Sequence, residues 1–240
     1  MMFSISIVCH GSGPMVQLLL NDLRHHLPDN SEILITLNKP EDETFLDEYA
    51  DLPIRVLRNV RDLGFGANHN QAYAASTGQY FVIANPDIRL TNSPFERLRQ
   101  ALQAPGVGAA APAVLSAGGQ VEDSVRRFPT VARLAERVIG GRRTADYDVS
   151  SALVAVPVDW AAGMFIAFAR TAFAAVGGFD TRYFMYMEDA DICRRLGAAQ
   201  WRVVLAPGAQ VIHNAQRASR RDARHLRWHL RSALRFLFHI

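Results

Sequence analysis

Short apolar runs alternate with amphipathic segments through the first part of the chain. The apolar runs at 3–9, 32–37, 54–57 and 80–84 predict strands. Helical spacing of Val16, Leu19, Leu20, Leu23 and Leu27 predicts a first helix, and a second opens at the Gly64-Phe65-Gly66 turn and ends near residue 75. A helical turn is expected at 44–49. Apolar strands that alternate with helices predict an α/β fold with a mostly parallel sheet covered on both faces.

The second part of the chain mixes the same patterns. Helices are predicted at 95–102, 171–176 and 187–196, the last ended by Gly197. Strands are predicted at 110–115 and 154–158, and the stretch 159–168 then gives a turn and another strand. Two further strands are predicted at 201–205 and 210–213, with a turn at 206–208. Residues 120–150 are rich in arginine and weakly patterned. An insertion that faces a substrate and a solvated surface both fit that composition.

Polar residues follow several of the predicted strands. His10, Asn38, Asn59 and Asp87 stand at carboxyl ends of strands, where parallel α/β sheets bind their ligands. Asp87 ends the sequence Asn85-Pro86-Asp87, which taken alone is good turn chemistry. His213 ends the last predicted strand, and a lone histidine there is more often structural. Together, Asp87 and His213 could hold a divalent cation.

The chain is organised around the stretch 177–197. It places Asp180, Glu188, Asp189 and Asp191 beside the aromatic residues Tyr183, Phe184 and Tyr186. Acids in the first turn of a helix are stabilised by its dipole, so a surface cap is the simplest interpretation. The aromatic residues draw the turn toward the interior, however, and buried acids raise one another's pKa. We therefore favour a site that needs a base or a cation. Asp191 is four residues before Arg195, a spacing that pairs across one helical turn.

Length and composition are those of a globular α/β protein. The chain has 240 residues, 49% of them hydrophobic and 20% charged, which suits one large α/β domain or two small ones. Its two cysteines, Cys9 and Cys193, lack metal-type spacing and indicate a reducing cytoplasmic compartment. No signal peptide is expected before the strand at 3–9, and the apolar run at 160–169 is too short to cross a bilayer.

The charge is concentrated at the C-terminus. The net charge is +3, but the segment from Arg217 onward carries seven arginines and one acid, which leaves the first 216 residues at −3. One helical face carries Leu226, Leu230, Ala233, Leu234 and Leu237, and an adjacent one carries Arg220, Arg224, Arg227, Arg231 and Arg235. This pattern predicts a basic amphipathic helix at 217–240. Binding to a membrane interface and docking on the domain or on a second subunit both remain open.

Several motifs in order resemble the family 2 glycosyltransferases, and most closely the bacterial rhamnosyltransferase-like subgroup. The resemblance covers about residues 3–215. Its motifs are Asn59 with Asp62-Leu63-Gly64-Phe65-Gly66 and Asn70, then Asn85-Pro86-Asp87, then Trp160 with Gly163, then Gly177-Gly178-Phe179-Asp180 through Glu188-Asp189 to Arg195, and Pro207 through His213.

The resemblance implies a GT-A fold and transfer of a sugar from a nucleotide-sugar with inversion at the anomeric carbon. Residues 1–216 would form the catalytic domain, with a nucleotide-binding half at 1–90 and an acceptor-binding half with a small second sheet at 91–216. Asp189 matches the catalytic base, with Glu188 beside it. Asp87 matches the last acid of the family's Asp-x-Asp motif, with Asn85 in place of the first, and His213 matches the histidine that completes a Mg²⁺ or Mn²⁺ site.

The remaining site residues follow from the same motifs. Nucleotide-sugar binding is assigned to His10, Asn38, Asn59, Asp62, Gly66, Asn70, Asn85, Asp87 and Gly163, and acceptor binding to Gly178, Asp180 and Tyr186. Two departures are visible. Leu37-Asn38 replaces the Asp-Asn pair that reads the nucleobase, with Asn38 or Asp42 as substitutes, and His10-Gly11 replaces the usual Tyr-Asn pair.

The resemblance suggests dTDP-rhamnose, or a UDP- or GDP-sugar, as donor and a glycan or lipid-diphosphate-linked acceptor in cell-surface polysaccharide synthesis. The expected location is cytoplasmic, with peripheral attachment to the inner face of the membrane through 217–240 as an option, and a homodimer also open. Two rival classes are a non-catalytic nucleotide-sugar-binding protein and a nucleic-acid-binding protein. No nucleic acid partner is expected, because no recognised nucleic-acid-binding motif is evident.

Overall fold

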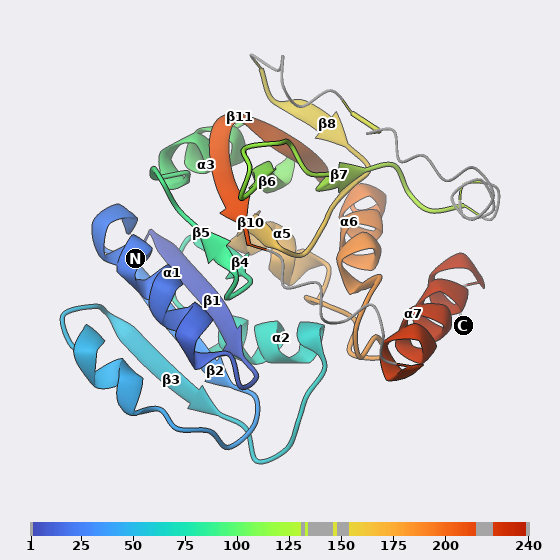
Figure 1. Cartoon of the computed structure of the whole chain (residues 1–240). Helices are drawn as coiled ribbons and strands as arrows, with labels where there is room; N and C mark the ends of the chain where they lie inside the picture. The colour runs from blue at the N-terminus through green and yellow to red at the C-terminus, as the bar shows by residue number, and fades with distance from the viewer. Residues whose placement is uncertain (1, 131–132, 134–145, 148–153, 215–222, 239–240) are drawn as a thin grey trace.

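The computed structural model (Figure 1) describes residues 2–130, 133, 146–147, 154–214 and 223–238. Its first half is a parallel sheet. The strands β1 (Phe3–Cys9), β2 (Glu32–Leu37), β3 (Ile54–Arg58) and β4 (Tyr80–Ala84) pair in the order β3-β2-β1-β4. Every residue of β2 and β4 is buried, as continuous apolar runs predict. The helices α1 (Gly13–His26) and α2 (Phe65–Ala75) and the short helix η1 (Thr44–Tyr49) connect them, where the sequence predicted them.

The second half extends the same sheet. β10 (Phe165–Ala169) runs antiparallel between β4 and β6 (Val107–Ser116), and β11 (Arg202–His213) pairs parallel to β6. Two short strands, β5 (Ile88–Arg89) and β8 (Val156–Val158), pair antiparallel to β11. β7 (Val125–Arg126) and β9 (Trp160–Ala161) form a separate two-stranded sheet. The predicted mostly parallel central sheet and small second sheet are confirmed, and the large sheet is continuous across residue 90.

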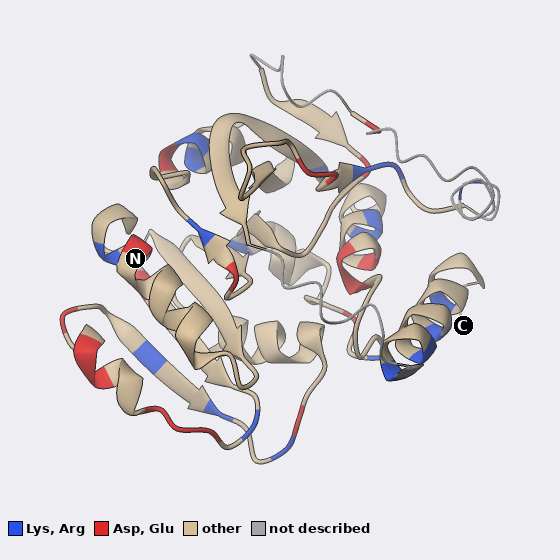
Figure 2. Ribbon diagram, viewed as in Figure 1, with Lys and Arg blue, Asp and Glu red and all other residues tan. Residues whose placement is uncertain are grey.

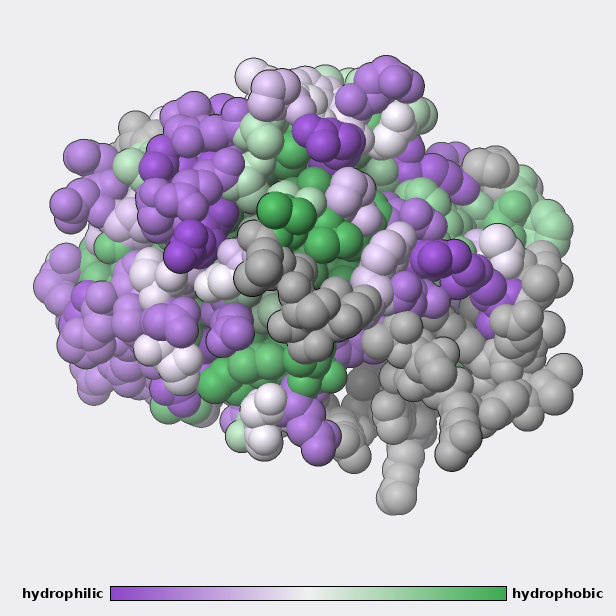
Figure 3. All heavy atoms as spheres, turned by 90° about the horizontal axis from the view of Figure 1, so that it is seen from above, coloured by the Kyte–Doolittle hydropathy of each residue, from purple (hydrophilic) through white to green (hydrophobic). Residues whose placement is uncertain are grey.

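Helices cover both faces of the sheet. One apolar core packs β1 and β4 against α1 and α3 (Phe95–Leu102) through side chains such as Leu20 and Phe95. The other packs the opposite face against α2, α5 (Arg170–Ala175) and α6 (Glu188–Ala198) through Phe173 and Ile192. The outer surface on the side of β1–β3 is largely hydrophilic (Figure 3). The two apolar cores, one on each face of the sheet, hold the strands in place and so position the strand ends that form the site.

Two predicted boundaries are wrong. The turn expected at 206–208 lies inside one strand, because β11 runs from Arg202 to His213 and absorbs the irregularity as a shift of its register against β6 between Leu205 and Gln210. Gly197 does not end the preceding helix, which continues to Ala198. A β-carbon at Gly197 would have no neighbour within 4 Å, so this glycine lies on an open helix surface.

The C-terminal helix α7 (Ala223–Phe238) packs beside α6 and the turn before it (Figure 1). Ser232 Oγ donates to the carbonyl of Met185 at 2.9 Å, and Arg194 Nη1 donates to the carbonyl of Phe236 at 2.9 Å. The start of the predicted tail, 217–222, lies outside the described residues, as does most of 131–153 within the arginine-rich segment. Among the described helices, none combines the length and hydropathy that a membrane span requires.

Candidate active site

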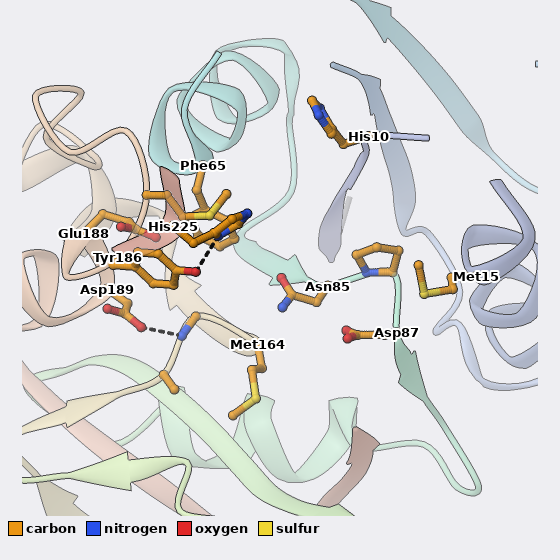
Figure 4. Close-up of a pocket in the computed structure, with 14 residues that line it drawn as sticks. His10, Met15, Phe65, Asn85, Asp87, Met164, Tyr186, Glu188, Asp189 and His225 are labelled. Carbon is orange, nitrogen blue, oxygen red and sulfur yellow. Dashed lines mark hydrogen bonds between the residues drawn. The ribbon is translucent and has the colours of Figure 1, made fainter. Parts of the chain in front are cut away.

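A cavity of about 700 Å³ opens beyond the carboxyl ends of β1 and β4, and the first turn of α6 forms its opposite wall. The lining brings together residues from distant parts of the chain: His10, Met15, Phe65, Asn85, Pro86, Asp87, Ala162, Gly163, Met164, Met185, Tyr186, Glu188, Asp189 and His225. Figure 4 shows Asp189 and Asp87 facing this space from different sides. Of the thirteen other predicted site residues, His10, Asn85, Gly163, Tyr186 and Glu188 also line the cavity.

Asp189 is held by backbone amides. Its Oδ2 accepts from the Gly163 N–H at 2.8 Å (Figure 4). Its Oδ1 accepts from the Ala190 N–H at 2.8 Å. Burial raises the pKa of this carboxyl, and the Gly163 amide opposes that shift by favouring the charged form. The arrangement gives a fixed carboxylate, aimed at the cavity, whose proton affinity exceeds that of an exposed aspartate. It can act as a base.

The turn before α6 aims these acids. Tyr186 and Met187 both adopt the left-handed region, with φ of 72° and 65°. Two consecutive non-glycine residues there cost conformational energy, which the surrounding packing must balance. Asp191 stabilises the other side of the same helix, since its Oδ2 accepts from Arg195 Nε at 2.7 Å, as its spacing predicted. Arg195 also donates to the carbonyls of Val176 and Gly178, which ties the turn at Gly177-Gly178, the Gly-Gly turn, to α6.

Glu188 is a second acid in the same wall. Its side chain is buried, and its Oε2 has no hydrogen-bond partner. Burial and the nearby charge of Asp189 raise its pKa well above the ordinary value of 4.5. Burial and the charge of Asp189 thus favour the protonated form of Glu188, whereas the two backbone N–H groups on Asp189 favour its charged form.

Asp87 lines the cavity and pairs with His213, which is not among the lining residues. His213 Nε2 is 3.2 Å from Asp87 Oδ2, and its Nδ1 is 2.9 Å from Glu122 Oε2. The hydrogen bond to Asp87 is the main cause that raises the pKa of His213 to about 9. Asp87 Oδ1 is buried and has no hydrogen-bond partner. A buried, unpartnered carboxylate oxygen beside a cavity suits a cation, although the described residues contain no ready-made cluster of three or more ligating side chains.

The predicted asparagines form a network beneath the cavity. Asn59 Nδ2 donates to Asn38 Oδ1 at 2.9 Å, and Asn38 Nδ2 donates to the Leu63 carbonyl at 3.0 Å. His10 extends the network, with its Nδ1 at 3.3 Å from Asn38 Nδ2 and its Nε2 at 3.9 Å from Asp62 Oδ2. Only His10 of these residues lines the cavity. Asn38, Asn59 and Asp62 therefore position the loop beside His10.

Three more predicted residues join α2 to the Gly-Gly turn. Asn70 Nδ2 donates to the Phe179 carbonyl at 2.8 Å, and Asn70 Oδ1 accepts from the Phe179 N–H at 2.9 Å. A β-carbon at Gly66 would lie 2.6 Å from Phe179 Cβ, and one at Gly178 would lie 2.5 Å from Asn70 Oδ1. These residues do not line the cavity; they allow close packing that places the turn.

The predicted acceptor residues divide in the same way. Tyr186 lines the cavity, but Asp180 does not. Asp180 instead forms an ion pair with Arg182, with Oδ2 2.7 Å from Nη2, and this partner lowers its pKa. Asp180 thus stabilises the turn that leads to Tyr186.

Sequence comparison identifies the family. The family model described as glycosyl transferase family 2 matches residues 4–161. The chain belongs to glycosyl transferase family 2. It is 31% identical to the N-acetylglucosaminyl-diphospho-decaprenol L-rhamnosyltransferase of Mycobacterium tuberculosis, over 96% of this chain and 82% of that protein. It is 29% identical to the rhamnosyltransferase WbbL of Escherichia coli, over 98% of this chain and 92% of that protein.

Solved structures agree in fold with this glycosyltransferase. GalNAc-T7 with UDP, GalNAc and Mn²⁺ superimposes with a TM-score of 0.71 at 17% identity, over 89% of this chain and 44% of that one. The mannosyltransferase PcManGT of Pyrobaculum calidifontis, in complex with GDP-Man and Mn²⁺, gives 0.66 at 18% identity, over 97% and 64%. The predicted GT-A fold is thereby confirmed.

Several lining residues of the glycosyltransferase escaped sequence reasoning. Met15, Phe65, Met164 and Met185 supply the apolar lining. Single apolar residues in a sequence carry no signal that separates a cavity wall from a core. His225 belongs to the basic helix that the sequence set apart from the catalytic domain, yet its Nδ1 lies 2.7 Å from the Tyr186 hydroxyl (Figure 4). The C-terminal helix thus contributes to the wall of the cavity.

Proposed function

We propose that the chain catalyses inverting transfer of a sugar from a nucleotide-diphosphate donor to a hydroxyl of a lipid-diphosphate-linked or glycan acceptor. The observation that carries the proposal is a single cavity with Asp87 on one side and Asp189 on the other. The relatives are rhamnosyltransferases, and one is named for an N-acetylglucosaminyl-diphospho-decaprenol acceptor. dTDP-rhamnose is therefore the first donor to test, before UDP- and GDP-sugars.

In the proposed reaction Asp189 is the base. The acceptor oxygen attacks the anomeric carbon while one Asp189 oxygen takes the hydroxyl proton, and the bond from that carbon to the diphosphate breaks. One displacement inverts the configuration without a sugar–enzyme intermediate. The Gly163 N–H keeps the carboxylate in place. Glu188, in its protonated form, can donate a hydrogen bond to the acceptor.

Asp87 and His213 are the residues proposed to hold a divalent cation, Mg²⁺ or Mn²⁺. His213 would ligate the cation only after losing the proton that its pKa of about 9 favours in the free protein. The unpartnered oxygen of Asp87 supports this role. Diphosphate oxygens and water complete the shell of such a cation when the protein offers few ligands. Such a cation, when bound, would neutralise charge that develops on the leaving diphosphate.

The other predicted site residues fall into two groups, those that line the cavity and those that support the lining residues. His10, Asn85 and Gly163 line the cavity and would contact the nucleotide-sugar, whereas Asn38, Asn59, Asp62, Gly66 and Asn70 would support these contacts from behind. Tyr186 would contact the acceptor, with Gly178 and Asp180 shaping its turn. We keep the division into a donor half at 1–90, an acceptor half at 91–216 and a C-terminal helix at 217–240.

We propose that the reaction takes place at the inner face of the cytoplasmic membrane, because a lipid-linked acceptor lies there. The rival function is nucleotide-sugar binding without transfer, which the same cavity would also support. A nucleic-acid-binding function has only the arginines of the C-terminal segment in its favour.

A donor screen tests the proposal. Thermal unfolding of the protein is measured with each nucleotide-sugar, with and without Mn²⁺ or Mg²⁺, and product linkage is read by NMR. A donor at about 100 times its Kd should stabilise the fold by about 2.7 kcal/mol. We expect this stabilisation to need the cation and to be lost in Asp87→Asn, and the product to carry the inverted anomeric configuration. A product with retained configuration would refute the mechanism, and binding without any transfer would favour the rival.

A further inference from the structure

The C-terminal helix α7 (Ala223–Phe238) has one face docked on the catalytic domain. His225 contacts Tyr186, Ser232 donates to the Met185 carbonyl, and Phe236 is buried against Phe128 and Arg194. This face is mixed, polar and aromatic. The leucines that the sequence assigned to an apolar face take little part in it.

The opposite face of α7 is an exposed apolar stripe. Leu226, Leu230, Leu234 and Phe238 recur every fourth residue, so they lie along one side of the helix. Their exposed fractions are 63%, 56%, 50% and 58%. Scattered exposed leucines are ordinary, but a continuous row on a helix already anchored by its other side is an interaction surface. The two alternatives from the sequence are thus compatible: α7 docks on the domain and still offers an apolar face.

The residues beside the apolar stripe are basic, which indicates an anionic partner. Arg227 and Arg231 follow Leu226 and Leu230 directly, and both are exposed. α7 contains no aspartate or glutamate, and Figure 2 shows its charged positions as basic throughout. Arg217, Arg220 and Arg221 precede the helix in the sequence. A row of leucines flanked by arginines matches the boundary between acyl chains and anionic headgroups.

Other partners fit less well. In a second copy of this chain, paired stripes would bring Arg227 and Arg231 against the same arginines with no acid on the helix to balance them. A nucleic acid would leave the leucines facing phosphates. A bilayer with anionic lipids satisfies both the apolar row and its basic flanks.

We propose that Leu226, Leu230, Leu234 and Phe238, with Arg227 and Arg231, form a surface that inserts into the interface of an anionic phospholipid bilayer. On the same helix, His225 lines the cavity. Docking of the stripe therefore brings the wall of the cavity to the lipid surface. The benefit for catalysis rests on the proposed lipid-linked acceptor; the binding itself does not.

The test is co-sedimentation of the full chain with vesicles of phosphatidylcholine alone or with phosphatidylglycerol added. We expect the wild type to bind the anionic vesicles, and binding to fall at least about tenfold in the double variant L230E/L234E. Leu18→Glu is the matched control, since Leu18 is an exposed leucine on α1, and it should bind like the wild type. R227Q/R231Q should weaken binding and reduce its dependence on salt.

Further measurements separate the outcomes. If L230E/L234E binds vesicles as the wild type does, the stripe is not the docking surface. If the wild type ignores vesicles and the variant instead disrupts a dimer in gel filtration, a second copy is the partner and the proposal is overturned. Donor-induced thermal stabilisation of L230E/L234E checks that the variant is folded and should match that of the wild type. A wild type that binds vesicles but transfers no sugar would contradict the proposed function alone.

Discussion

Glu188 and Asp189 are adjacent acids with different environments, and we propose different roles for them on that basis. Asp189 accepts two backbone N–H groups, which favour its charged form, whereas Glu188 Oε2 has no partner. The neutral form of Glu188 is therefore the one that the fold accommodates. Asparagine or glutamine in these positions would mimic a protonated acid, so the two substitutions should have unequal consequences.

Glu188→Gln should retain activity. Because glutamine resembles the protonated carboxyl that burial favours at this position, kcat should stay within about tenfold of the wild type. The measurement is nucleotide-diphosphate release under saturating donor and acceptor. A loss of kcat as large as that of Asp189→Asn would show that Glu188 acts as a charged group.

The same substitution should stabilise the protein at alkaline pH. A carboxyl whose pKa is raised by folding binds its proton more tightly in the folded state. The free energy of unfolding is therefore greatest at low pH, where this carboxyl is protonated in both states. The free energy of unfolding declines as the pH rises from 4.5, the ordinary pKa of a glutamate, toward the raised pKa of the folded state. Each pKa unit corresponds to about 1.4 kcal/mol.

Glu188→Gln should therefore raise the Tm at pH 8, by about 2–4 °C for each kcal/mol recovered, and change it little at pH 4. Calorimetry at both pH values checks this. An equal change at both would indicate a packing effect rather than a charge.

At the level of elements, the site depends on how closely α2 approaches the Gly-Gly turn. A β-carbon at Gly66 would meet Phe179, whereas one at Gly197 on α6 would meet nothing. Gly66→Ala should destabilise the fold by about 1–3 kcal/mol because α2 must move away. Gly197→Ala, in an open helical position, should stabilise it by about 0.5–1 kcal/mol. Urea unfolding measures both, and equal effects of the two substitutions would contradict this packing role.

At the scale of the whole molecule, local patterns predicted most of the sheet and its covering helices. β2 and β4 were visible because buried parallel strands are apolar throughout. The continuity of β11 through Pro207 and Gly208 was not, since a register shift in the pairing with β6 absorbs those residues without ending the strand. Such tertiary pairing leaves no trace in a local pattern.

The sequence predicted those site residues whose side chains are charged and stand at the end of a strand or the start of a helix. Carboxylates at strand and helix ends indicated Asp87 and Asp189, and both line the cavity. The supporting roles of Asn38 and Asn70 could not be separated from ligand contacts, because an asparagine serves either purpose. His225 was missed because it lies on α7, far along the chain, and only folding brings it to Tyr186.

The most direct measurement is sugar transfer by Asp189→Asn, with donor affinity determined by calorimetry on the same protein. We predict that kcat falls by about 10²–10⁴-fold, since removal of a general base costs this much, while the donor Kd is unchanged. A variant that transfers sugar at the wild-type rate would contradict the assignment of Asp189 as the base on which the mechanism depends.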